Sequence, residues 1–169
     1  MITDLVQIRT LAKAKEAENV DFRRHISVHH PPPQLLAQIA AKITAAIDCT
    51  QCSNCCRETL VEVSEGEIGA IARFLNSPVA DVVREYTVGG RMLRQNADGC
   101  VFLDGNLCMI YAVRPQACRE FPHLTLARAT LGGRISSIER NAWLCPIVYN
   151  ALEAYKSALG YPKSRPDAT

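Results

Sequence analysis

A helix is predicted over residues 34–47, because apolar side chains recur there at a spacing that places them on one helical face. These side chains are Leu35, Leu36, Ile39, Ile43 and Ile47. Residues 4–28 have a helical but strongly charged pattern. The three prolines at 31–33 are expected to end that segment, since proline cannot donate a backbone hydrogen bond.

Later helices are indicated by the residues at their ends. Ser64 and Glu67 have the spacing of a capping box, which predicts a helix that continues through Phe74. Pro78 is expected at the first position of the next helix. Residues 146–159 have an amphipathic pattern, and Gly160 is suited to cap that helix at its C-terminus.

Short strands are predicted between these helices. Residues 60–63 are a strand candidate, and residues 101–111 predict a β-hairpin around Asp104-Gly105-Asn106. A second hairpin is predicted from residues 124–131 and 134–138, which flank Gly132-Gly133. Because helices outnumber strands and do not alternate with them regularly, the fold class predicted is α+β.

Length and composition predict one small domain preceded by an extension. A chain of 169 residues can form a hydrophobic core that needs no disulfide or metal for its stability, and 48% of these residues are hydrophobic. We expect residues 1–32 to form a charged helical extension and residues 33–165 to form the domain that carries the cysteines.

Cysteine is the residue type that carries candidate chemistry. There are eight: Cys49, Cys52, Cys55, Cys56, Cys100, Cys108, Cys118 and Cys145. The N-terminus lacks the pattern of a secretory signal, and no apolar run is as long as the roughly 18 residues that span a membrane, so we expect a cytoplasmic protein. In that compartment such cysteines bind metal more often than they form disulfides. A role as small buried apolar side chains is the less favoured interpretation.

Charge also favours bound cations. The formal net charge of +2 would fall to −6 if all eight thiols ionised, and buried thiolates without cations would be strongly unfavourable. We therefore expect two centres of four cysteines each, or one polynuclear centre, at the heart of the mainly helical fold. The partition we favour is Cys49, Cys52, Cys55 and Cys145 for one set, and Cys56, Cys100, Cys108 and Cys118 for the other.

The spacing bears on the identity of the metal. Cys49, Cys52 and Cys55 come from one loop, and the distant Cys145 is followed by Pro146. This arrangement is typical of iron–sulfur ligation. Zinc ribbons use two separate Cys-x2-Cys knuckles, and the second half of the chain has none. Iron or an iron–sulfur cluster is therefore the favoured cofactor, with zinc as the alternative.

The motifs together resemble a known family. The run Cys49-x2-Cys52-x2-Cys55-Cys56, the segment from Cys108 to Pro122 that contains Arg114-Pro115 and Cys118-Arg119, and the pair Cys145-Pro146 resemble the YkgJ-type cysteine cluster proteins. These proteins carry the CxxCxxCC zinc- or iron-chelating domain. The resemblance covers roughly residues 10–160 and implies that all eight cysteines are metal ligands.

Four residues are predicted to lie around the ligands. Arg119 would donate hydrogen bonds to a sulfur or a carboxylate, and Arg114 belongs to a rigid turn that presents Cys118. Tyr111 would pack around the site, and His123 lies near it in sequence. Trp143 is expected in the core, whereas His25 and His29 are expected to face solvent or a partner rather than a metal.

Other function classes find little support. Phosphate-binding loops, a nucleophile elbow and the strong basic stripe of nucleic-acid binders are all missing from the sequence. We assign no catalytic residue and expect neither nucleic acid nor membrane as a partner. Two classes remain: a redox or maturation protein with an iron or iron–sulfur centre that serves a protein partner, and a zinc-stabilised interaction module without chemistry.

Overall fold

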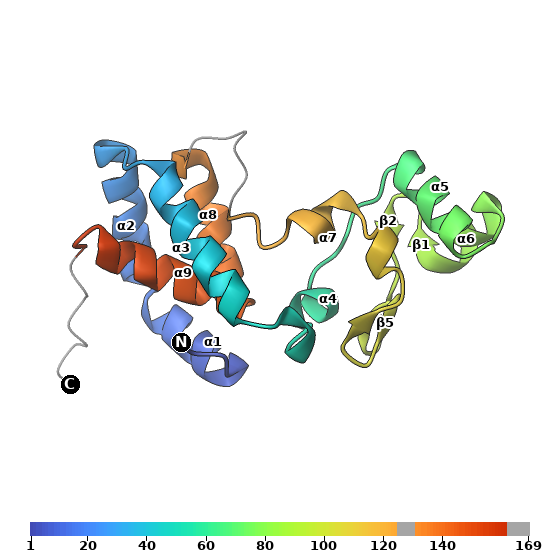
Figure 1. The fold of residues 1–169 in the computed structure, drawn as a ribbon, viewed down its shortest axis with the longest axis horizontal. Helices are drawn as coiled ribbons and strands as arrows, with labels where there is room; N and C mark the ends of the chain where they lie inside the picture. Colours follow the sequence, from blue (N-terminus) through green and yellow to red (C-terminus); the bar gives the residue numbers. More distant parts are fainter. Residues whose placement is uncertain (125–130, 162–169) are drawn as a thin grey trace. The chain divides into compact units, whose positions relative to one another are not determined.

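The computed structural model describes residues 1–124 and 131–161 and divides the chain into two compact units (Figure 1). Residues 1–48 and those from Pro122 onward form the first, which we call the helical unit. Residues 49–121 form the second, which we call the cysteine unit because it contains all the cysteines except Cys145.

The helical unit is built around its last helix. Its elements are α1 (Leu5–Ala14), α2 (Glu16–His29), α3 (Pro33–Ala46), α8 (Leu131–Ala142) and α9 (Pro146–Ala158). Helix α9 contacts α1, α3 and α8, and it buries side chains on most of its circumference. The fully buried Tyr155 of α9 meets Phe22 of α2 edge to face, with ring centroids 6.0 Å apart. Such a surrounded helix is the centre of the apolar core.

A buried polar network lies within this helical core. Lys156 is only 3% exposed, and its ammonium donates hydrogen bonds to Glu18, Asn19 and Glu153. Lys15 also pairs with Glu153. A buried charge is tolerated only when it is paired and hydrogen-bonded. These contacts therefore fix the position of α2 along α9.

The cysteine unit combines short helices with two-residue strands. Its helical elements are η1 (Cys49–Gln51), α4 (Asn54–Glu58), α5 (Glu65–Phe74), α6 (Val79–Tyr86), η2 (Tyr111–Val113) and α7 (Gln116–Glu120). Its strands form three antiparallel pairs: β1 (Thr87–Val88) with β2 (Met92–Leu93), β3 (Gln95–Asn96) with β4 (Gly99–Cys100), and β5 (Leu103–Asp104) with β6 (Leu107–Cys108).

A small apolar core holds the cysteine unit together. It includes Ile71 of α5, Val82 of α6, and Phe102 and Ile110, which flank β5 and β6. Cys100, Cys108 and Cys118 are partly buried against this core. The candidate ligands therefore sit on well-packed structure, which limits their movement.

The fold class is confirmed as α+β, and several predicted elements are confirmed with it. The capping box is present, since the Ser64 hydroxyl accepts from the Glu67 amide and the Glu67 carboxylate accepts from the Ser64 amide. The turn at Gly105 joins β5 and β6 as expected, although each strand is only two residues long. Helix α9 begins at Pro146, and Gly160 follows it with φ 65°.

Three predictions were wrong, and one element is smaller than expected. Pro78 is the N-cap residue of α6 and not its first helical residue. Residues 134–138 are not a strand but part of α8, which begins at Leu131; the remainder of that predicted hairpin, residues 125–130, lies outside the described residues. The 60–63 strand is reduced to a single bridge between Glu62 and Met92. Trp143 is not in the core, since its side chain is 44% exposed.

The division into an extension and a metal-binding domain at residue 33 stays a prediction. Within the part of the chain that the structure describes, no helix is both long and apolar enough to span a membrane.

Candidate metal centre

The first four cysteines lie on a tight turn followed by one short helix. In η1 the amides of Cys52 and Ser53 both donate to the Cys49 carbonyl, at 3.1 and 2.9 Å. Ser53 then adopts a left-handed conformation with φ 49°, which reverses the chain into α4 and places Cys55 and Cys56 there. The buried Ser53 hydroxyl donates to the Asn106 carbonyl at 2.6 Å, which supports this uncommon backbone geometry.

Arg57 attaches this loop to two hairpin turns. Its guanidinium donates to the carbonyl of Asp98 at 2.9 Å, to the carbonyl of Gly105 at 2.7 Å and to Asn106 Oδ1 at 2.8 Å. Asp98 belongs to the β3–β4 turn, and Gly105 and Asn106 form the β5–β6 turn. The hairpins that carry Cys100 and Cys108 are therefore held against the helix that carries Cys55 and Cys56.

Cys100 and Cys108 have the same local environment. The Phe102 amide donates to the sulfur of Cys100, and the Ile110 amide donates to the sulfur of Cys108. In both cases the donor lies two residues after the cysteine, and its own side chain is buried in the core. Amide hydrogen bonds of this kind stabilise the thiolate form, which is the form that binds metals.

Cys118 is placed by a contact between α5 and α7. One oxygen of the Glu67 carboxylate accepts from the amide and hydroxyl of Ser64, and the other accepts from the Gln116 amide at 2.7 Å. Partial burial raises the pKa of Glu67, but these hydrogen bonds and the charge of Arg119 lower it more, so the net shift is downward. Glu67 thus ties the helix that carries Cys118 to the capping box of α5.

The charges of Cys56, Cys100, Cys108 and Cys118 interact with one another. A hydrogen bond from Cys55 lowers the pKa of Cys56 to about 7, with help from the cations of Arg114 and Arg57. Burial raises the pKa of Cys118 to about 12, and the charges of the other three thiols add to that increase. Burial likewise raises the pKa of Cys100 and Cys108. A metal cation bound beside them would favour the ionised form of all four thiols.

Arg114 is the cation whose charge acts on three of these four thiols. Its charge lowers the pKa of Cys56, Cys108 and Cys118, and its guanidinium lies 3.7 Å from the centre of the Tyr111 ring. Tyr111 is 55% exposed and its ring lies under the Arg114 guanidinium, and its predicted place around the ligands stays a prediction. Arg119 is exposed and its charge lowers the pKa of Glu67, whereas its predicted hydrogen bond to a sulfur or a carboxylate stays a prediction.

The other candidate ligands are distributed between the two units. Cys49 is exposed and Cys52 is half-buried, both on the η1 turn. Cys145 is buried in the helical unit, where it is the N-cap residue of α9. His123 is also in the helical unit and has a left-handed backbone with φ 61°. None of the eight cysteines forms a disulfide, and all of them lie within residues 1–124 and 131–161.

A coordination sphere is not formed in this structure. Among the residues that the structure describes, no three His, Cys, Asp or Glu side chains converge closely enough to hold a metal ion. The chemistry of the donors nevertheless fits a thiophilic metal, because four thiols share one electrostatic environment with two amide donors and a guanidinium. The ligand set and its partition into two centres stay predictions.

Comparison with protein families identifies the cysteine pattern. Residues 48–146 match the family described as "CxxCxxCC: Putative zinc- or iron-chelating domain". The chain belongs to this family. The CxxCxxCC match begins one residue before Cys49 and ends one residue after Cys145, so it includes all eight cysteines. Searches of curated proteins and of solved structures find no match.

The sequence did not identify every residue that builds this CxxCxxCC region. Arg57 and Ser53 donate hydrogen bonds to the hairpin turns, and the backbone of Gly99 lies against that of Arg57, yet none of these residues was predicted to position the cysteine loop. The position of Arg57 in the sequence could have indicated its role, since a cation directly after Cys56 is well placed to offset thiolate charge. The indication for Gly99, which directly precedes Cys100, was weaker, because glycine in a strand often indicates a close approach of two backbones.

Proposed function

We propose that this protein holds iron, as an iron–sulfur centre or as iron alone, and serves a redox or maturation role for a protein partner in the cytoplasm. The observation that carries the proposal is the common environment of Cys56, Cys100, Cys108 and Cys118, supported by hydrogen bonds from the Phe102 and Ile110 amides. Membership of a zinc- or iron-chelating family supports metal binding itself.

Each group would contribute to the centre in a defined way. The eight cysteines would supply thiolate ligands, and the bound metal would supply electron transfer or support for chemistry on the partner. The Phe102 and Ile110 amides would offset negative charge on Cys100 and Cys108, and hydrogen bonds to sulfur are among the factors that set reduction potential. Arg114 would offset charge on Cys56, Cys108 and Cys118.

The preference for iron over zinc rests on the loop. Three cysteines at two-residue spacing followed by a distant Cys-Pro pair match iron–sulfur ligation better than a zinc ribbon. The alternative is a zinc-stabilised interaction module. It is favoured because eight thiolate ligands would leave no open position for a substrate, which is the arrangement of structural zinc sites.

The test is metal and sulfide analysis of protein purified without oxygen from iron-replete cells. The proposal expects at least about two iron equivalents per chain, with labile sulfide if the centre is a cluster. Colourless protein that contains about two zinc equivalents under the same conditions would establish the interaction module instead. Metal-free, fully folded protein with eight titratable thiols would contradict both.

A further inference from the structure

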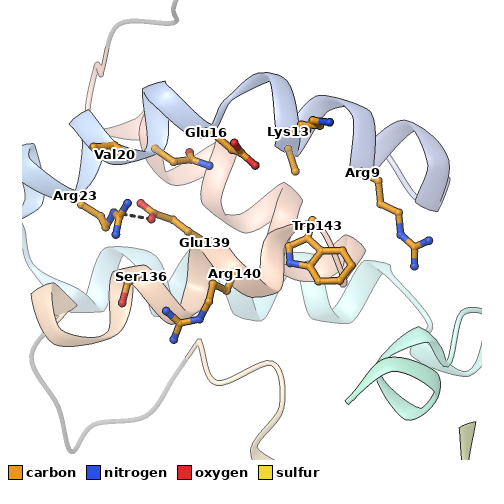
Figure 2. A pocket seen from close by; sticks show the side chains of 11 residues that line it. Arg9, Lys13, Glu16, Val20, Arg23, Ser136, Glu139, Arg140 and Trp143 are labelled. Carbon is orange, nitrogen blue, oxygen red and sulfur yellow. Dashed lines mark ion pairs between the residues drawn. The ribbon is translucent and has the colours of Figure 1, made fainter. Parts of the chain in front are cut away.

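A groove crosses the surface of the helical unit between α1, α2 and α8 (Figure 2). Its volume is about 600 Å³, and all its lining residues belong to these helices or to the residue directly after α8. It contains no cysteine, so neither the predicted metal ligands nor the proposed function accounts for it.

The walls of the groove are mainly cationic. Arg9 and Lys13 of α1 lie on one side and Arg140 of α8 on the other, and all three are exposed (Figure 2). Glu16 is the one exposed acidic residue that lines it. A surface of this kind attracts negative charge and disfavours basic partners.

Two apolar side chains in the same groove are left open to solvent. Trp143 is 44% exposed and Val20 is 48% exposed, although residues next to each of them are buried. Arg9 lies over the Trp143 ring, with its guanidinium 5.8 Å from the ring centre. Tryptophan and arginine are the residue types that most often dominate the binding energy of protein interfaces.

The floor of the groove contains an acceptor that lacks a hydrogen bond. The Glu139 side chain is 9% exposed, and its Oε2 pairs with Arg23 Nε at 2.8 Å, as the dashed line in Figure 2 marks. The second oxygen, Oε1, is buried and has no hydrogen-bond partner. A buried acceptor left unsatisfied is costly, so Glu139 places a weakly compensated polar group beneath the groove.

We propose that this groove binds an acidic helical segment of a partner protein. Its carboxylates would pair with Lys13 and Arg140, and an apolar side chain would cover Trp143 and Val20. A peptide segment suits the site better than a small molecule, because the groove is open to solvent and small-molecule pockets enclose most of their ligand. The proposal is independent of which metal the cysteines hold.

The experiment is selection of a displayed library of helical peptides on the metal-loaded, full-length protein. Enriched peptides are expected to be net negative with an apolar residue among the acidic ones. Isothermal titration should show binding that weakens by at least about tenfold in Lys13→Glu, Arg140→Glu and Trp143→Ala. Lys42→Glu is the matched control, since Lys42 is an exposed cation on α3 outside the groove, and it should bind as the wild type does.

Several results would overturn the proposal. The first is enrichment of peptides without a bias toward negative charge. The second is peptide binding that Lys42→Glu weakens as much as Arg140→Glu does. The third is peptide binding by Trp143→Ala that equals that of the wild type. Complete competition by inorganic phosphate or ATP at equal charge concentration would identify a small anion as the ligand. A dimer in sedimentation that Arg140→Glu dissociates would identify a second copy of the chain as the occupant. Circular dichroism of each variant separates lost binding from lost folding.

Discussion

Gly99 lies directly against the backbone of Arg57. A Cβ atom at position 99 would come within 2.6 Å of the Arg57 Cα and 2.8 Å of the Cys56 carbonyl oxygen. Gly99 also has φ +121°, a conformation that other residues rarely adopt. The approach of the cysteine loop to the strand that carries Cys100 thus depends on the absence of a single methyl group.

Gly99→Ala is therefore expected to lower the free energy of unfolding by about 2–4 kcal/mol, since backbone strain and a backbone clash act together. It should also lower metal content, because Cys56 and Cys100 can no longer approach each other as closely. Urea denaturation and elemental analysis measure the two effects. Gly66→Ala is the control, as no atom lies within 4 Å of its Cβ position and the residue is in α5, where alanine is the better helix former.

Arg57→Gln should separate the cysteine loop from the two hairpin turns. The variant loses hydrogen bonds to Asp98, Gly105 and Asn106, and because Arg57 is exposed, the cost is expected to be about 1–2 kcal/mol. Metal affinity should fall as well, which a chelator competition assay measures. Arg73→Gln, at an exposed cation of α5, should leave stability and affinity unchanged; an equal effect at both positions would contradict the role given to Arg57.

Cys52→Ala and Cys118→Ala are each expected to lower metal content and melting temperature together. Loss of one ligand leaves the remaining thiolates with less compensating charge, and the contribution of the metal to folding is lost with it. His25→Ala should change neither quantity. If Cys118→Ala kept full metal occupancy and the wild-type melting temperature, Cys118 would be an ordinary buried cysteine and the eight-ligand hypothesis would be wrong.

Glu139 should make the stability of the helical unit depend on pH. Burial raises its pKa from 4.5 to about 7, against the opposing charges of Arg23, Lys156 and Arg140. The folded state therefore binds more protons than the unfolded state between these values. Stability from this group is fully present below about pH 4.5 and is lost as the pH rises to about 7.

Glu139→Gln tests this dependence. The variant cannot ionise at this position, so its stability relative to the wild type should rise by about 1–2 kcal/mol between pH 5 and pH 8, a figure reduced for the water that reaches the groove. Urea denaturation of both proteins at the two pH values gives the difference. A difference that did not change with pH would show that the Glu139 pKa is not raised.

Local signals predicted the helix ends well. The Ser64–Glu67 capping box and Pro146 at the start of α9 act within one helical turn, so the residues alone are sufficient to identify them. Gly132-Gly133 led to the incorrect prediction of a hairpin, because paired glycines often form turns. In the structure they lie within α8, where Ile135 and Ile138 are buried and α8 packs on α2 and α9. Tertiary packing outweighs a helix penalty of about 1 kcal/mol per glycine.

The arrangement around the cysteines was only partly predictable. Their number and spacing are visible in the sequence, but Arg57 contacts residues about forty to fifty positions away. The groove was missed because its walls come from residues 9–23 and 136–143, and because Trp143 was expected in the core. Long-range contacts of this kind follow from packing rather than from any local pattern.

The position of Trp143 gives the molecule a selective optical reporter. It is the only tryptophan in the chain, and it lies in the helical unit, whereas seven of the eight cysteines lie in the cysteine unit. Tryptophan emission will therefore follow the helical unit, while the absorption of a metal held by Cys56, Cys100, Cys108 and Cys118 would follow the cysteine unit. One sample titrated with denaturant can thus reveal whether the two units unfold in a single cooperative step or in two.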